Sequence, residues 1–177
     1  VCDLDSPEPL IQGAIASIGG EDRQLYTPYA GLPDLREAIA AKLRRHNQLD
    51  YQAENVAVCT GSSGAFFAAG MTLLEPGDEV VLFEPFYDSY PACCAMAGAT
   101  PRFVTLRFPD FALDEAAIEA AIGEKTRVML VNTPHNPTGK VFSDADLDLI
   151  ARIAARHDLI VISVSYTHLR AHETDTD

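Results

Sequence analysis

Residues 128–162 read VMLVNTPHNPTGKVFSDADLDLIARIAARHDLIVI, and this stretch decides the fold class. It opens with the apolar run Val128–Val131 and closes with the apolar run Leu159–Ile162, and neither run alternates with polar residues. Such runs are typical of strands that are buried on both faces of a parallel sheet. Between them, Ser143 and Asp146 form a capping-box-like helix start, followed by apolar residues at helical spacing. The stretch therefore predicts a strand, a helix and a parallel strand.

The same alternation extends through most of the chain. Three further apolar runs predict strands at Val56–Cys59, Val80–Phe83 and Phe103–Leu106. Apolar spacing predicts one helix from Leu32 to Leu43, and a second helix is expected after Asp114, which is a favourable N-cap. Because strand–helix–strand units have right-handed crossovers, the sequence predicts an α/β fold with a doubly wound, mostly parallel sheet.

The composition is that of an acidic globular protein. The 177 residues include 13 Lys+Arg and 26 Asp+Glu, which gives a formal net charge of −13. This charge argues against nucleic acid as a partner, because phosphate binding requires a basic surface. No apolar run reaches the roughly 18 residues of a membrane span and no export signal is present, so we expect no membrane partner and a cytoplasmic location. The four cysteines lack zinc-ligand spacing, and we expect reduced thiols and no metal site.

Ligands of such sheets bind beyond the carboxyl ends of the strands, so the loops there are the candidate sites. Thr60–Ala65 combines two glycines and two serines at a helix start, which suits a phosphate group or is an ordinary N-cap turn. Aromatic residues in Glu84–Tyr90 either stack on a flat heterocycle or belong to the core. In the rigid loop Asn132–Lys140, Asn136 either donates to a ligand oxygen or bonds only backbone. We expect His135 to face solvent.

Four motifs in this order carry a family resemblance. They are YTPYAGLPDLREAI from Tyr26, TGSSGA from Thr60, FEPFYDSY from Phe83 and NTPHNPTGK from Asn132. Together they resemble the class I and II aminotransferases, which are pyridoxal-phosphate-dependent enzymes of fold type I, over about residues 6–163. FEPFYDSY followed by AMAG is similar to the branch of kynurenine, glutamine and methionine aminotransferases. The resemblance implies that the sheet is an incomplete part of the large, cofactor-binding domain of such an enzyme.

The resemblance also assigns roles to the candidate residues. Gly61, Ser62 and Ser63 match the positions that hold the phosphate of pyridoxal 5′-phosphate. Tyr87 matches the aromatic residue that stacks on the pyridine ring of the cofactor. Asn136 matches the asparagine that donates a hydrogen bond to the 3′ oxygen of the cofactor. These expectations agree with the donors and aromatic groups that the loops themselves offer.

Tyr26 matches a tyrosine that reaches the cofactor phosphate of the neighbouring subunit, so the resemblance implies a homodimer. The implied reaction transfers an amino group from an amino acid to a 2-oxo acid. Two alternatives stay open: a C–S β-lyase that uses the same site, and a non-catalytic, aminotransferase-like sensor module of a transcription regulator. The residues that follow Ser163 in the gene would distinguish an enzyme from a sensor.

The sequence departs from the family pattern after Ser163. Val164 stands where the family has an aspartate beside the pyridine nitrogen. The chain contains only Lys42, Lys125 and Lys140, and none of them has the sequence context of the lysine that binds the cofactor covalently. We therefore assign no catalytic residue and expect these 177 residues alone to be inactive.

Three segments follow from this comparison. Residues 1–25 are predicted to be an N-terminal arm, and residues 26–163 a partial cofactor-binding domain. Residues 164–177 are predicted to be a non-native tail, because VSYTHLRAHET resembles the translation of a sequencing adapter and fits no helix or strand pattern. The chain begins at Val1 rather than Met, which indicates a fragment, and the resemblance implies that this fragment is the N-terminal part of a longer enzyme.

Overall fold

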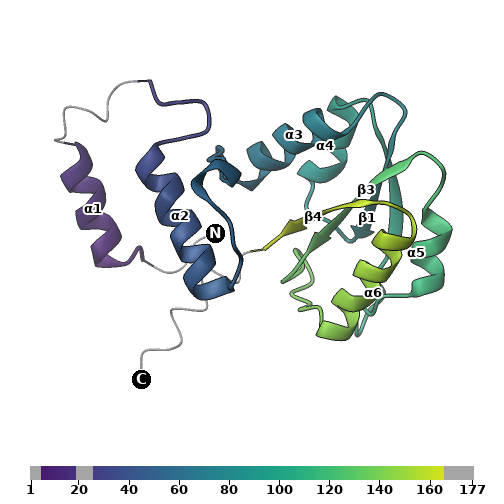
Figure 1. Cartoon of the computed structure of the whole chain (residues 1–177). Helices are drawn as coiled ribbons and strands as arrows, with labels where there is room; N and C mark the ends of the chain where they lie inside the picture. Colours follow the sequence, from purple (N-terminus) through teal and green to yellow (C-terminus); the bar gives the residue numbers. More distant parts are fainter. Residues whose placement is uncertain (1–4, 19–25, 166–177) are drawn as a thin grey trace. The chain divides into compact units, whose positions relative to one another are not determined.

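The computed structural model describes residues 5–18 and 26–165, and the chain divides into two compact units between Val58 and Cys59 (Figure 1). The first unit spans residues 1–58, and the second spans residues 59–177. Of the helices in the described ranges, none is both long enough and apolar enough to cross a membrane.

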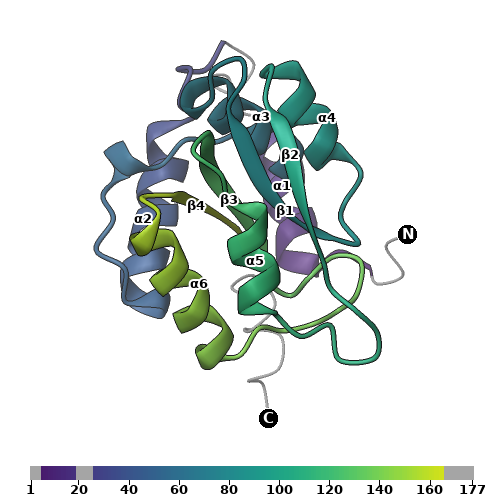
Figure 2. The ribbon, with the colours of Figure 1, turned by 90° about the vertical axis from the view of Figure 1, so that its right-hand side faces the viewer.

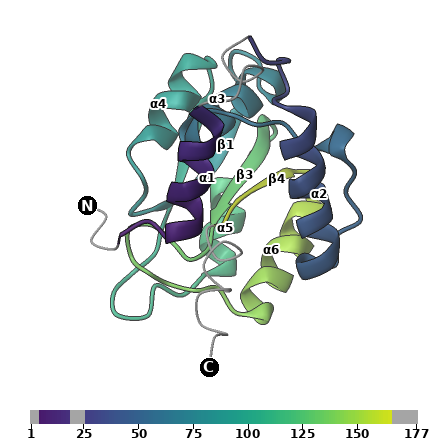
Figure 3. The same cartoon turned by 90° about the vertical axis from the view of Figure 1, so that its left-hand side faces the viewer.

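The described residues of the first unit form helices and the segments that connect them. The described α-helices of this unit are α1 (Glu8–Ile18) and α2 (Pro33–Asn47) (Figure 3). α1 has no buried residue, and η2 (Ala53–Asn55) is a short 3-10 helix. α2 confirms the first predicted helix. Its first residue is proline, which lacks only an N–H that would have no partner inside the helix. An aspartate in its first turn and arginines in its last turn match the helix dipole.

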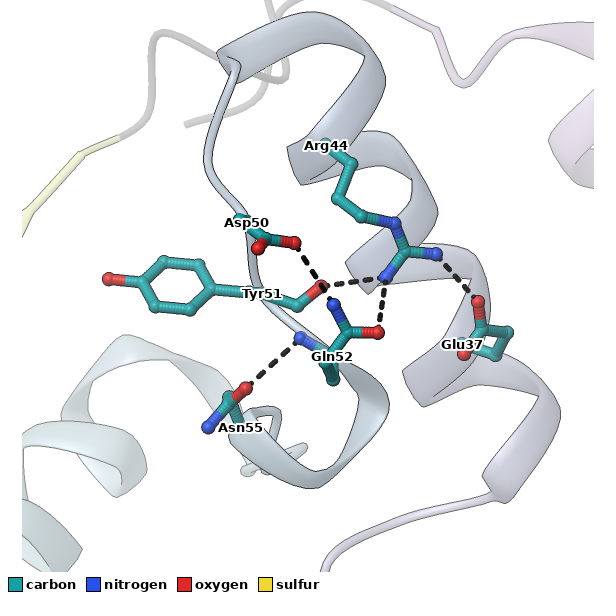
Figure 4. A network of polar contacts seen from close by, with 6 residues as sticks. All are labelled: Glu37, Arg44, Asp50, Tyr51, Gln52 and Asn55. Carbon is teal, nitrogen blue, oxygen red and sulfur yellow. Dashed lines mark hydrogen bonds and ion pairs between the residues drawn. The ribbon is translucent and has the colours of Figure 1, made fainter.

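Arg44 on α2 fixes the chain that follows the helix (Figure 4). Its guanidinium donates to the backbone oxygen of Tyr51 at 2.7 Å and forms an ion pair with Glu37 at 2.8 Å. Farther along, the backbone N–H of Gln52 donates to the side-chain oxygen of Asn55 at 3.0 Å. These bonds hold the segment between α2 and η2 in an irregular but well-paired conformation.

The predicted strand Val56–Cys59 is wrong, because backbone groups of Val56 and Val58 bond to other parts of the first unit instead of joining a sheet. The Val56 oxygen accepts a hydrogen bond from Nε of Arg36 at 2.8 Å. The Val58 N–H donates to the oxygen of Ala30 at 3.0 Å. The hydrogen-bond partners of this segment are thus the Arg36 side chain on α2 and the Ala30 backbone in a turn before α2, and not a neighbouring strand.

The second unit is built around a four-stranded sheet. Its strands are β1 (Glu79–Glu84), β2 (Thr100–Thr105), β3 (Thr126–Asn132) and β4 (Ile160–Val164). All neighbouring pairs are parallel, and the order across the sheet is β2-β1-β3-β4. This result confirms the parallel sheet and the other four predicted strands, although β2 begins at Thr100 rather than at Phe103.

Burial differs between the central and the edge strands. The inner residues of β1 are all buried, and every residue of β3 except its second is buried. β2 and β4 each have one neighbour in the described sheet, and exposed side chains on them include Phe103, Ile160 and Val161. The prediction of strands buried on both faces is therefore right for the two central strands and wrong for the two edge strands.

Helices cover both faces of the sheet, which confirms the doubly wound arrangement. They are α3 (Gly61–Leu73), α4 (Ser89–Met96), α5 (Glu115–Ala121) and α6 (Asp144–Arg156). Val80 and Leu82 of β1 pack in one core with α3 and α4, whereas Val81 and Phe83 pack in a second core with α5 and α6 (Figure 2). Successive strand residues thus point to opposite cores, as the pleat requires.

Two predicted helix starts are confirmed. The Ser143 hydroxyl accepts from the backbone N–H of Asp146 at 3.2 Å, and the Asp146 carboxylate accepts from the Ser143 N–H at 2.9 Å. This reciprocal pair is the capping box that the sequence predicts for α6. The Asp114 carboxylate accepts from the first N–H groups of α5.

The described cysteines are free thiols. Cys93 and Cys94 are buried in α4, and Cys59 is exposed. Burial raises the pKa of Cys94 to about 11. Cys2 lies outside the described residues.

Candidate functional site

Two of the candidate loops leave the sheet at the same edge. β1 ends at Glu84 and β3 ends at Asn132, and the two strands are parallel neighbours. Tyr87, three residues after β1, and Asn136, four residues after β3, therefore follow adjacent strands at their carboxyl ends. This is the edge at which doubly wound sheets bind ligands.

The third candidate loop begins α3 beside the first of these turns. The Ser63 hydroxyl donates to the hydroxyl of Ser89 at 3.3 Å, and Ser89 is the first residue of α4, two residues after Tyr87. Gly61, the first residue of α3, has a φ of +71°, which favours glycine. The Gly61 N–H donates to the Cys59 oxygen at 3.0 Å. The N-cap residue Thr60 makes no side-chain cap, so the N–H groups that follow Gly61 in the first turn of α3 receive no capping acceptor from it.

Tyr87 is held by aromatic contacts and keeps part of its ring accessible. Its ring meets that of Tyr90 edge to face, with centroids 5.7 Å apart, and Tyr90 in turn meets Phe66 of α3 at 5.4 Å. Tyr90 and Phe66 are buried, whereas Tyr87 is 38% exposed. The row of rings orients Tyr87 and leaves it room to contact another flat group.

Side-chain bonds fix the Asn132–Lys140 loop. The backbone N–H of Asn136 donates to Oδ1 of Asn132 at 2.9 Å, and the N–H of Phe142 donates to the Thr133 hydroxyl at 3.1 Å. The Asn136 carboxamide is half-buried and has no hydrogen-bond partner among residues 5–18 and 26–165. The loop is therefore rigid around an amide that is available to a ligand.

The expectation that His135 faces solvent is wrong. The side chain is 4% exposed, and its Nδ1 lies 2.8 Å from the Thr138 hydroxyl. Its ring packs against Phe142, with centroids 6.2 Å apart. Burial lowers the pKa of His135, and a hydrogen bond with the Phe83 backbone opposes this effect. The histidine is a neutral internal support of the loop, because the loop folds back over its own side chain.

Two residues near the site were missed by sequence reasoning. Asn132 is 2% exposed and bonds both to Asn136 and, through Nδ2, to the Val164 oxygen at 3.0 Å. A polar residue that ends an otherwise apolar strand is the signal that could have indicated it. Ser89 became evident only through its contact with Ser63, which no sequence spacing predicts.

The three lysines occupy different parts of the described structure. Lys125 precedes β3 and thus lies at the opposite, amino-terminal edge of the sheet. Lys140 ends the Asn136 loop; its charge adds to hydrogen bonds from Ser143 that lower the pKa of Asp146 at the start of α6. Lys42, on α2, donates to the Asn47 side chain at 2.9 Å. Within the second unit, neither the Lys125 nor the Lys140 side chain forms a hydrogen bond with Tyr87 or Asn136 in the described structure.

The structure describes Tyr26, and it describes only the first two residues of the predicted tail. Tyr26 belongs to the first unit and is fully exposed. Val164 ends β4, and its oxygen accepts from the Thr133 N–H at 3.1 Å as well as from Asn132. Beyond Val164 and Ser165, the predicted tail lies outside the described residues.

Comparison with known proteins identifies the family. The sequence profile of "Aminotransferase class I and II" matches residues 4–164. The chain belongs to the class I and II aminotransferases. These are pyridoxal-phosphate-dependent enzymes, as the resemblance of the four motifs implies.

Several aminotransferases are similar in sequence. The probable N-succinyldiaminopimelate aminotransferase DapC of Mycobacterium tuberculosis is 46% identical over 172 residues, which cover 94% of this chain and 43% of the relative. The aspartate/prephenate aminotransferase of Thermus thermophilus is 37% identical, with 94% and 44% covered. The chain thus spans less than half the length of these relatives.

Solved structures agree with this assignment. The N-succinyldiaminopimelate aminotransferase of M. tuberculosis superposes with a TM-score of 0.86 over 91% of this chain and 42% of that one. YbdL of Escherichia coli, reported to have a methionine aminotransferase function, is 34% identical with a TM-score of 0.86, over 91% and 43%. The sheet is therefore part of the fold type I aminotransferase architecture.

The side chains and backbone at the carboxyl edge fit pyridoxal 5′-phosphate. The start of α3 has N–H groups without a capping acceptor, which suit a phosphate. The part-exposed Tyr87 ring suits a pyridine ring, and the unpartnered Asn136 carboxamide suits an oxygen on that ring. At Val164 this edge lacks a carboxylate, and Lys140, the lysine of the loop after β3, does not have the sequence context of the lysine that binds the cofactor covalently.

Proposed function

We propose that this chain forms the phosphate- and ring-binding side of an aminotransferase site that transfers an amino group from an amino acid to a 2-oxo acid. The observation that supports this proposal most strongly is the position of three turns. Tyr87, Asn136 and the uncapped start of α3 all belong to the carboxyl edge of β1 and β3, in a chain of the aminotransferase family.

Each residue has one proposed task. The Gly61 N–H already donates to the Cys59 oxygen at 3.0 Å, so the N–H groups that follow Gly61, with the hydroxyls of Ser62 and Ser63, hold the phosphate. Tyr87 lies against the ring and fixes its plane. Asn136 donates from its carboxamide to the 3′ oxygen and fixes the rotation of the ring in that plane. When bound, pyridoxal phosphate supplies an electron sink that makes the Cα proton of an amino acid easier to remove.

The remaining proposals concern the whole protein. Tyr26 reaches the phosphate held by a second copy of the chain, so the active form is a homodimer. Residues 1–25 act as an arm, residues 26–163 belong to the cofactor-binding domain, and the enzyme works in the cytoplasm. The relatives are named for N-succinyldiaminopimelate, aspartate and prephenate, so these substrates and methionine are the first to test.

The test uses the complete gene product. We expect it to bind pyridoxal phosphate and to transaminate at least one of these amino acids with a 2-oxo acid. Asn136→Ala should weaken cofactor binding by about tenfold, the value of one hydrogen bond to a polar ligand. Asn47→Ala, an equal truncation on α2, is the matched control and should bind as the wild type does. A gene product that neither binds the cofactor nor transaminates would refute the proposal.

A second experiment addresses the 177 residues alone. We expect no turnover, because none of Lys42, Lys125 and Lys140 has the sequence context of the lysine that binds the cofactor covalently. Treatment with pyridoxal phosphate and borohydride, followed by peptide mass spectrometry, reports any lysine that carries the cofactor. A trapped adduct on one of the three lysines together with turnover would overturn this expectation.

A further inference from the structure

Asn132 joins the ends of two neighbouring strands through a single side chain. It is the last residue of β3, and it is 2% exposed. Its Oδ1 accepts from the Asn136 N–H at 2.9 Å, and its Nδ2 donates to the Val164 oxygen at the end of β4 at 3.0 Å. Both polar atoms of the carboxamide are thus occupied, as burial requires.

These two bonds act on the backbone that carries the candidate ring contacts. The Asn136 side chain has no hydrogen-bond partner of its own in the described structure, so its direction depends on where its backbone is held. The Val164 oxygen accepts from both Thr133 and Asn132, so the end of β4 depends on the same side chain. Removing the carboxamide would release the loop and the strand end together.

We propose that Asn132 is a positioning residue for the cofactor ring. Its two hydrogen bonds fix the position of the Asn136 backbone relative to the end of β4, and Asn132 itself does not touch the ligand. The inference rests on the proposed function, because these bonds matter for the ring only if the cofactor binds beside Asn136. Asparagine suits this place because it offers one acceptor and one donor on a planar group. Aspartate keeps the acceptor but turns an oxygen toward the Val164 oxygen, and alanine loses both bonds.

The first measurement needs no cofactor. Hydrogen exchange of the complete gene product should show a slowly exchanging Asn136 N–H, and Asn132→Ala should speed its exchange by about tenfold as the loop opens. Asn132→Asp should keep Asn136 protected and speed exchange at Thr133, whose N–H shares the Val164 oxygen. The Asn132→Asp variant therefore distinguishes the effect of the bond to Asn136 from the effect of the bond to Val164. It also gives a result if Asn132→Ala does not fold.

The second measurement reads the orientation of the ring. Asn132→Ala should weaken pyridoxal phosphate binding about tenfold and reduce the visible circular dichroism band that an immobilised ring produces. Thr126→Val is the matched control: Thr126 is a buried polar residue at the other end of β3, bonded to Gly123 and Glu79. It should lose stability and keep both the affinity and the dichroism band of the wild type.

The outcomes separate the two proposals. A wild-type protein that binds no cofactor refutes the proposed function, whereas the exchange result at Asn136 stands by itself. A wild type that binds the cofactor, with Asn132→Ala showing unchanged exchange at Asn136 and an unchanged dichroism band, refutes the role of Asn132. Equal losses of the band in Asn132→Ala and Thr126→Val also refute it, since the effect would then follow stability alone.

Discussion

Two alanine substitutions at the start of α3 should change stability in opposite directions. Gly61 has a φ of +71°, and a Cβ built on it would meet no atom within 4 Å. Gly61→Ala thus makes no clash, and its cost is that of a left-handed backbone, about 1 kcal/mol. Gly64 has no such φ, and its Cβ would lie 3.8 Å from the Thr60 Cβ, an ordinary contact. Gly64→Ala should stabilise the helix by about 0.5–1 kcal/mol.

Urea denaturation followed by far-ultraviolet circular dichroism measures both effects. The free energies of unfolding of the two variants should differ by about 1.5–2 kcal/mol, the sum of the two contributions, with the wild type between them. The comparison is valid where each protein unfolds in a single transition with an unchanged denaturant slope.

Each of two results would refute the reasoning. A neutral Gly61→Ala would mean that the left-handed conformation at the start of α3 does not exist in solution. A destabilising Gly64→Ala would mean that its Cβ meets an atom that the structure does not place there. In either case the N–H directions proposed for the phosphate would have to be abandoned as well.

Three further predictions concern the second unit. Ser143→Ala should lower the free energy of unfolding by about 1 kcal/mol in urea titrations, because it removes the N-cap of α6. The hydrogen bond from His157 lowers the pKa of Glu119, so its stabilisation is present above pH 4.5, the ordinary Glu value, and is lost as the pH falls through the lowered pKa. Wild type and His157→Ala should therefore differ in urea stability above pH 4.5, and the difference should shrink as the pH falls below that value. Iodoacetamide should alkylate the exposed Cys59 at least about tenfold faster than Cys94, whose pKa burial raises to about 11, as peptide mass spectrometry can show.

The sequence predicts those parts of the fold that local pattern controls. β1 and β3 are uninterrupted apolar runs because helices cover both of their faces, and the structure confirms them. The helix start at Ser143 is also local, since the two bonds of its capping box join residues three apart. Such features depend on neighbours in the chain, so composition and spacing are sufficient to find them.

The features that the sequence does not predict depend on distant partners. Val56–Cys59 has the composition of a buried strand, but Arg36, twenty residues earlier, binds the Val56 oxygen. His135 is buried because its loop closes over it and its ring meets Phe142. In each case a hydrogen bond or ring contact formed across a turn decides the outcome, and no periodicity in the sequence reports it.

The candidate site divides in the same way. Tyr87 and Asn136 could be selected in advance because ligands gather where parallel strands end, which topology alone dictates. Asn132 could not be selected, because its importance lies in bonds to Asn136 and to the end of β4, and the register of β3 against β4 is needed to place it there. Residues that would contact the ligand can therefore be predicted from the strand topology, whereas a residue that holds them in place, such as Asn132, is found only in the three-dimensional structure.

An added negative charge distinguishes a helix start built for an anion from an ordinary N-cap turn. The first turn of α3 has no acidic residue, although the chain carries a net charge of −13, and the start of α4 lies beside it through the Ser63–Ser89 bond. Ser62→Asp should stabilise α3 by about 0.5 kcal/mol through the helix dipole. The same carboxylate would repel a phosphate, so pyridoxal phosphate binding by the complete gene product should fall sharply. Greater stability without loss of cofactor affinity would show that the phosphate binds elsewhere.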